Sequence, residues 1–87
     1  MENRIQTIAI KEWFYDKTED ISSRYNCFID FERDENGNRK VEDGRVFVTV
    51  EEVLNESEKA VQVRLRTGDV VGSTKGWKTW IPKSVIK

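Results

Sequence analysis

The sequence predicts a single, mainly β domain: five or six short antiparallel strands in a bent sheet or small barrel, with at most one short helix. Apolar and polar residues alternate with a period of two in several short segments, and glycine-containing turn signals separate these segments. The chain has 87 residues, enough for one modest core but too few for two domains. We therefore treat residues 1–87 as one domain.

The first apolar segment, residues 5–15, fits two patterns. Ile8, Ile10 and Phe14 alternate as in a strand interrupted by a glutamate. The alternative is a helix, whose apolar stripe would consist of Ile5, Ile8, Ala9 and Trp13. We favour the strand and leave the helix open.

Residues 16–20 are polar and predict a loop, after which Ile21 is expected to fold back onto the core. Residues 24–33 alternate again and predict a half-buried strand. Its inner face carries Cys27, the one cysteine of the chain, which we interpret as a small core residue rather than a reactive thiol.

Two dipeptides mark turns, Asn36 with Gly37 and Asp43 with Gly44, because these residue types tolerate the positive φ that tight hairpins require. Residues 45–50 follow with alternating valines and predict the strand richest in β-branched residues.

Beyond residue 50 the sequence allows a short helix, because Thr49 and Glu52 have the spacing of a capping box, or a strand that continues through Leu54 to a turn at residues 55–58. We prefer the strand, because residues 60–66 resume strict alternation at once.

In the segment 60–66 the period of two places Arg64 and Arg66 on the surface opposite the apolar residues. A turn at residues 67–69, a brief strand at residues 70–71 and a connection at residues 72–76 should follow.

The last strand is predicted at residues 77–81. It should end at Pro82, and residues 83–86 should form a 3₁₀ turn whose Val85 and Ile86 close the core. Alternation puts Trp77 and Trp80 on opposite faces, and we expect Trp80 to be the exposed one.

Composition excludes several chemistries. The chain has no histidine and one cysteine, so it cannot form a Cys/His zinc site, a Ser-His-Asp triad or an internal disulfide. Carboxylates at Asp30, Glu32, Asp34 and Glu35 could in principle form a magnesium site or a two-carboxylate hydrolase, but their position around a turn indicates a solvated surface. We expect no enzyme, no metal and no cofactor.

The chain lacks an apolar run of the roughly 20 residues that cross a bilayer, and no signal-like stretch follows Met1. We therefore expect a soluble protein without membrane contact in the cytoplasm.

The charge is divided along the sequence. Residues 1–57 carry 14 acidic and 8 basic side chains, whereas residues 58–87 carry 2 acidic and 7 basic ones, although the net charge is only -1. Basic residues with tryptophans among them are typical of a surface that binds a polyanion or an acidic protein. The candidate partner-binding residues are Arg64, Arg66, Lys75, Trp77, Lys78, Trp80 and Lys83.

The chain ends with the pattern Trp-Ile-Pro-Lys-Ser-x-Ile, preceded by a strand of the type Lys-Ala-Val-x-Val. From about residue 46 onward it resembles a group of short phage and prophage proteins with this ending. The resemblance implies a mobile genetic element, hence a host cytoplasm, and includes no uniform activity. The apolar residue and proline before a 3₁₀ turn are also similar to the end of an SH3-like barrel, but the aromatic residues of a proline-peptide groove are absent.

Three functions remain open. The first is a non-enzymatic phage protein, such as an anti-CRISPR-type inhibitor, that binds a host protein or nucleoprotein complex stoichiometrically. The second is a small nucleic-acid-binding barrel in which a tryptophan stacks on bases. The third is a virion structural or accessory protein that associates edge to edge through residues 45–50, if that strand lies at the sheet margin. The sequence leaves the oligomeric state undetermined.

Overall fold

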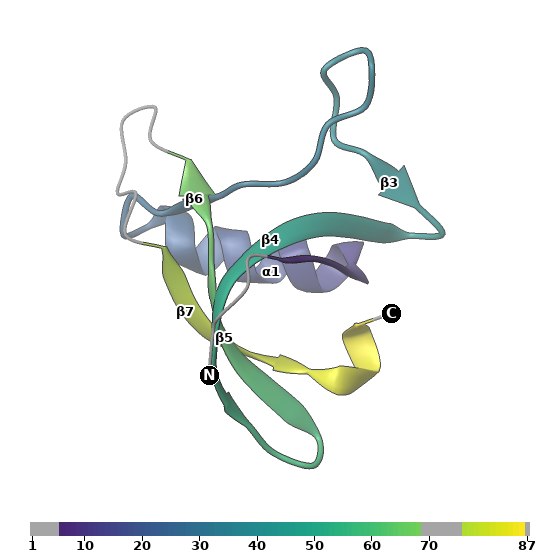
Figure 1. Cartoon of the computed structure of the whole chain (residues 1–87). Helices are drawn as coiled ribbons and strands as arrows, with labels where there is room; N and C mark the ends of the chain where they lie inside the picture. The colour runs from purple at the N-terminus through teal and green to yellow at the C-terminus, as the bar shows by residue number, and fades with distance from the viewer. Residues whose placement is uncertain (1–5, 69–75, 87) are drawn as a thin grey trace.

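The structure is a computed structural model that describes residues 6–68 and 76–86 (Figure 1). It confirms a mainly β, antiparallel, single-domain fold with one α-helix, and the described strands form no closed barrel. The strands are β1 (Gln6–Lys11), β2 (Phe28–Ile29), β3 (Val41–Glu42), β4 (Arg45–Glu56), β5 (Ala60–Leu65), β6 (Thr67–Gly68) and β7 (Trp77–Pro82), and the helices are α1 (Glu12–Ser23) and the 3₁₀ turn η1 (Lys83–Val85).

The main sheet has the order β1-β4-β5-β7, with β3 also paired to β4, and β2 pairs with β6 in a second, two-stranded sheet. Strand β4 is long and bent (Figure 1). Its pairing with β5 shifts register after Val50 and again after Val53. Such irregularities bend a strand, so β4 can pair with β1 and β3 through one half and with β5 along the other. The sheet curls until Ile10 of β1 forms a single bridge with Ile86.

Residues 5–15 are only partly the strand that we favoured. Strand β1 ends at Lys11, and helix α1 begins at Glu12 and runs through the predicted loop at residues 16–20, so that loop is wrong. The buried stripe of α1 consists of Tyr15, Thr18 and Ser22, two of them short and polar. A stripe of this composition gives almost no apolar periodicity in the sequence, which is why the helix was missed.

Ile21 does not fold back onto the core; it is 44% exposed on α1. The chain leaves the helix, which ends at Ser23, through a left-handed residue, Asn26 at φ 60°, and the Cys27 N–H donates to the Ser22 carbonyl at 3.0 Å. Asparagine is a common substitute for glycine at this position. Cys27 is buried, as the sequence predicts.

The predicted strand at residues 24–33 is reduced to β2, two residues long. Beyond it the chain is held by separate hydrogen bonds: the Asp30 N–H donates to the Arg66 carbonyl at 3.0 Å and the Glu32 N–H to the Phe47 carbonyl at 2.9 Å. The apolar and polar residues alternate in this segment although it forms no continuous strand, because alternate residues bond to different parts of the fold.

Both predicted turns are confirmed. A bridge between Arg33 and Arg39 closes the first, which contains Gly37 at φ 83°. Asp43 and Gly44 have φ of 53° and 72° in the hairpin that joins β3 to β4. Two successive positive φ values are what a two-residue type I′ hairpin requires.

The C-terminal predictions are largely confirmed. The chain remains a strand beyond residue 50, because β4 continues to Glu56, and β7 and η1 follow the predicted order. The turn predicted to begin at Thr67 is instead the short strand β6. The predicted strand at residues 70–71, and most of the connection at 72–76, lie outside the described residues.

One core fills the concave side of the sheet. Tyr15 of α1 and Val85 of η1 close it against the strands, which explains how a largely polar helix can stay attached to the sheet. The buried core residues are Ile10, Tyr15, Ile29, Val46, Val48, Val50, Val63, Leu65, Ile81 and Val85.

Candidate functional site

Three of the predicted basic site residues are paired with carboxylates of β4. Strand pairing sets Arg64 opposite Glu52, and their side chains meet at 2.5 Å. Arg66 lies 3.3 Å from Glu51. Acidic and basic halves that are separate along the sequence therefore face each other across the β4–β5 ladder, where their charges largely cancel.

Lys83 is also paired, at 2.6 Å from Glu56. The hydrogen bond from Lys83 and its positive charge lower the pKa of the Glu56 carboxyl below its usual range. Lys75, another predicted site residue, lies outside the described residues.

The remaining site residues lie on β7. Trp80 is 47% exposed and Lys78 is exposed beside it, as strand alternation predicts. Trp77 is half-buried, and its ring stacks on that of Tyr25 with centroids 5.7 Å apart. Trp77 therefore already has an aromatic partner within the chain, and Trp80 is available at the surface.

A groove about 220 Å³ in volume separates helix α1 from β7, and we call it the α1–β7 groove. Its helix side presents residues three and four apart, which share one face of an α-helix. Its walls carry both apolar and basic groups. The lining residues are Phe14, Lys17, Thr18 and Ile21 of α1 and Trp77, Lys78, Thr79 and Trp80 of β7.

The sequence alone does not point to the helix side of this groove, because the polar residues 16–20 predict a loop. A helical reading of residues 12–23 would have placed Phe14, Lys17 and Ile21 on one face. Lys17 and Lys78 make no ion pair within the described part of the chain. The groove therefore has two unneutralised cations beside exposed apolar side chains.

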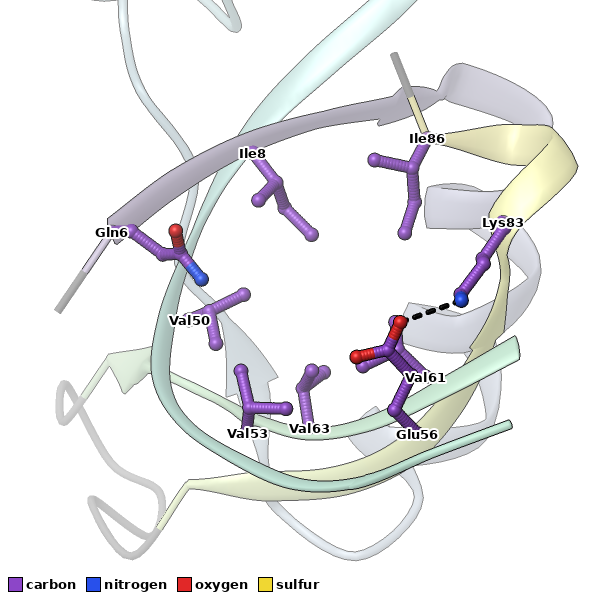
Figure 2. Close-up of a pocket in the computed structure, with 9 residues that line it drawn as sticks. All are labelled: Gln6, Ile8, Val50, Val53, Glu56, Val61, Val63, Lys83 and Ile86. Atoms are coloured by element: carbon purple, nitrogen blue, oxygen red, sulfur yellow. Dashed lines mark hydrogen bonds and ion pairs between the residues drawn. The ribbon is translucent and has the colours of Figure 1, made fainter. Parts of the chain in front are cut away.

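A second pocket opens at the end of the curled sheet (Figure 2). Side chains from β1, β4, β5 and the C-terminal segment point toward one space of about 330 Å³. Its floor is aliphatic, and its polar groups are an amide and the Glu56–Lys83 ion pair on the rim. The lining residues are Gln6, Ile8, Val50, Val53, Glu56, Val61, Val63, Lys83 and Ile86.

This second pocket can accept an apolar group, since its floor offers aliphatic contacts. It offers little for catalysis, because its one carboxylate and its one ammonium group already neutralise each other. We therefore regard the α1–β7 groove as the stronger candidate site.

An aromatic and ionic cluster lies on another side of α1. The hydroxyl of Tyr15 lies 2.7 Å from the Ile29 carbonyl and 3.0 Å from the Glu19 carboxylate. Burial and the negative charge of Glu19 hold the pKa of Tyr15 well above its ordinary value. A tyrosine that is fully buried and kept neutral in this way stabilises the fold and cannot serve as a general base near neutral pH.

Arg39 covers this cluster. Its guanidinium lies 4.8 Å from the centre of the Tyr15 ring and bridges Glu12 at 3.1 Å and Asp16 at 3.0 Å. Burial lowers the pKa of Arg39, but hydrogen bonds to the two carboxylates outweigh that effect and raise it. Every charge in the bridge has a partner, so the cluster attaches the turn that the Arg33–Arg39 bridge closes to helix α1.

Among the described residues, no group of three or more acidic or cysteine side chains is arranged to hold a metal ion. Asp34, one of the carboxylates considered above, accepts hydrogen bonds from the backbone N–H groups of Asn36 and Asn38 within the turn. In the same described part of the chain, no helix has the length and apolar character needed to span a bilayer.

Comparisons of the chain with protein-family models, with curated proteins and with solved structures gave no match.

Proposed function

We propose that this chain is a non-enzymatic binding protein that acts by stoichiometric contact with another protein, and that the α1–β7 groove is the contact surface. The observation that carries the proposal is Trp80, which is 47% exposed at the rim of a groove that also holds the 44% exposed Ile21. Binding energy concentrates in such large side chains, with tryptophan the most enriched among them.

The resemblance of the C-terminal segment to phage and prophage proteins makes a host protein or nucleoprotein complex the partner to test first. A folded domain of this size can inhibit by covering a functional surface, as an anti-CRISPR-type inhibitor does, and it needs no chemistry of its own. The host cytoplasm would be the place of action.

Nucleic-acid binding has less support. Its candidate phosphate contacts are Arg64, Arg66, Lys75, Lys78 and Lys83. Three of the five, Arg64, Arg66 and Lys83, would have to leave a carboxylate of β4 before binding a phosphate. Exchange of one anionic partner for another releases little net energy.

Self-association through the valine-rich strand also has less support. Residues 45–50 belong to β4, which lies between β1 and β5 in the centre of the main sheet. The condition for edge-to-edge pairing of that strand is therefore not met.

The proposal can be tested by affinity capture from a bacterial host lysate with the tagged chain and two variants. Trp80→Ala removes the exposed ring of the groove, and Val41→Ala truncates an apolar side chain on β3 of similar fractional exposure, 42% against 47%. We expect one host protein to bind in fixed stoichiometry to the wild type and to Val41→Ala, and to be lost with Trp80→Ala.

Calorimetry with the purified partner should then show at least about thirtyfold weaker binding by Trp80→Ala, the usual effect of a hot-spot residue. Capture that is indifferent to Trp80→Ala would rule out this groove. Binding of a short single-stranded DNA at low salt, with no protein captured, would favour the nucleic-acid alternative.

A further inference from the structure

Strand β7 is an edge strand. It stands last in the order β1-β4-β5-β7, and within the described residues it pairs with β5 alone. The bridge between Ile86 and Ile10 lies beyond η1 and does not cover β7. In that part of the chain, the second edge of β7 therefore has backbone groups without a sheet partner, and such an edge is a template for another strand.

The register shows which backbone groups these are. The Lys83 N–H donates to the Lys59 carbonyl at 2.8 Å, in line with the pairing of Val61 with Ile81 and of Val63 with Thr79. The N–H and C=O groups of one strand residue point to the same side, and this side alternates from each residue to the next. The backbone groups of Thr79 and Ile81 therefore face β5.

The backbone N–H and C=O groups of Lys78 and Trp80 consequently face away from the sheet. The backbone of Pro82 faces the same way as that of Lys78 and Trp80, and proline is tolerated where its missing N–H would point away from the sheet. The free edge thus presents two donors and two acceptors in the spacing that an added strand requires.

This edge borders the α1–β7 groove, so an added strand would also find side-chain contacts. Phe14 and Ile21 on the helix and the ring of Trp80 offer apolar surface to alternate side chains of an extended segment. A strand edge beside a helix, with backbone pairing for affinity and pockets for alternate side chains, is a recurrent way of binding extended peptides.

The charges of the groove indicate the chemistry of the occupant. Lys17 on α1 and Lys78 on β7 are both without an ion pair, as described above, so an acidic side chain placed between helix and strand would be stabilised. A second copy of this chain is a poorer occupant, because edge-to-edge pairing of two β7 strands would bring the Lys78 side chains of both copies close together.

We propose that an extended segment of a partner protein, with acidic residues between apolar ones, adds as a strand to the free edge of β7 within the α1–β7 groove. This inference rests on the proposed function and names the kind of segment that the same surface takes.

The probe is a phage-displayed library of random peptides of about twelve residues, selected on the immobilised full chain. Enriched peptides should alternate Asp or Glu with aliphatic or aromatic residues. Their affinities, from fluorescence anisotropy, should then be compared for the wild type, Lys78→Ala and Lys78→Pro. Both variants lose the ammonium group, but only Lys78→Pro also loses the outward N–H.

We expect Lys78→Pro to bind about tenfold or more weakly than Lys78→Ala, since the peptide would be left with an unpaired acceptor. Hydrogen exchange at the amides of Lys78 and Trp80 should slow when the peptide binds. If Lys78→Pro does not fold like Lys78→Ala by circular dichroism, N-methylation of the selected peptide provides the second test. Methyl groups on one alternate set of its amides should abolish binding, and those on the other set should not.

Several results would overturn the inference. The selection could enrich no peptides, or it could enrich basic ones. Lys78→Pro and Lys78→Ala could bind the peptide equally, with N-methylation of the peptide having no effect. Sedimentation could also show a dimer that Lys78→Pro dissociates. A captured host protein that requires Trp80 but tolerates Lys78→Pro would leave the proposed function standing and remove strand addition. If the wild-type chain captured no host protein whose binding depends on Trp80, the proposed function itself would be ruled out.

Discussion

Two sides of helix α1 carry similar residue types but differ in whether these residues are buried and paired within the chain. On one side the Tyr15 ring is fully buried, and Arg39 bridges two carboxylates above it. On the side of the α1–β7 groove, Lys17 has no ion pair among the described residues, and Ile21 is 44% exposed. A cation beside an aromatic ring is thus part of the fold where its partners are internal, and is available for binding where they are missing.

Strands β5 and β7 show the same contrast. Arg66 of the β5–β6 connection is paired with Glu51, whereas Lys78 of β7 lines a groove that has no carboxylate among its lining residues. The difference arises from position in the sheet, because β5 lies beside the acidic stretch of β4 and β7 lies one strand further away. Charge alone does not distinguish the two.

The largest difference between the two sides of α1 should be in stability. Tyr15→Ala removes a fully buried ring and should lower the free energy of unfolding by about 3–5 kcal/mol, whereas Trp80→Ala should lower it by less than about 1 kcal/mol. Urea unfolding monitored by circular dichroism measures both. Tyr15→Phe removes only the hydroxyl, which lies within hydrogen-bond distance of the Ile29 carbonyl and the Glu19 carboxylate, and should cost about 1–3 kcal/mol. Equal losses for Tyr15→Ala and Trp80→Ala would contradict the contrast.

The Tyr15 side should also be sensitive to alkali. Its pKa is raised in the folded state, so its contribution to stability is complete below the unfolded-state pKa of about 10 and is lost as the pH rises above it. Stability should fall by up to about 1.4 kcal/mol per pH unit in that range. Denaturant unfolding at several alkaline pH values should show this slope in the wild type and a smaller one in Tyr15→Phe. An unchanged slope would mean that Tyr15 is not responsible.

A smaller effect should separate the arginine beside β4 from the lysine of β7. Arg66→Ala breaks the pair with Glu51 and should cost about 0.2–1 kcal/mol, whereas Lys78→Ala should change stability by less than about 0.5 kcal/mol. Binding to a captured partner or a selected peptide should respond in the opposite order. A complex weakened by Arg66→Ala and not by Lys78→Ala would move the contact surface to the β4–β5 face.

The smallest effect concerns the rim of the second pocket. Lys83 lowers the pKa of Glu56 in the folded state, so the pair contributes to stability above the unfolded-state pKa, and this contribution is lost as the pH falls through the folded value. Carbon-13 NMR titration of the Glu56 carboxyl should give a pKa below the usual value of about 4.3, and Lys83→Met should raise it. An identical pKa in both proteins would show that the pair does not form in solution.

Features that depend on near neighbours in the chain could be predicted. The strands at residues 45–56 and 60–65, the hairpin at Asp43 and Gly44, and the 3₁₀ turn after Pro82 follow from local alternation and backbone preference. The exposure of Trp80 follows from the same alternation once Ile81 is placed in the core.

Helix α1 could not be predicted in this way, because its buried stripe of Tyr15, Thr18 and Ser22 carries too little apolar signal and is recognised only by the core that receives it. The pairing of the charges could not be predicted from local sequence either. Glu51 and Glu52 neutralise the basic side chains of the next strand because the β4–β5 register brings them together.

The sequence by itself determined the strand periods, the turns and the position of the exposed tryptophan, since each depends on a few adjacent residues. Only the tertiary structure decided which cations are free and that α1 lies beside the open edge of β7. Ion pairing and groove formation depend on side chains distant in sequence, and long-range packing alone sets their distances.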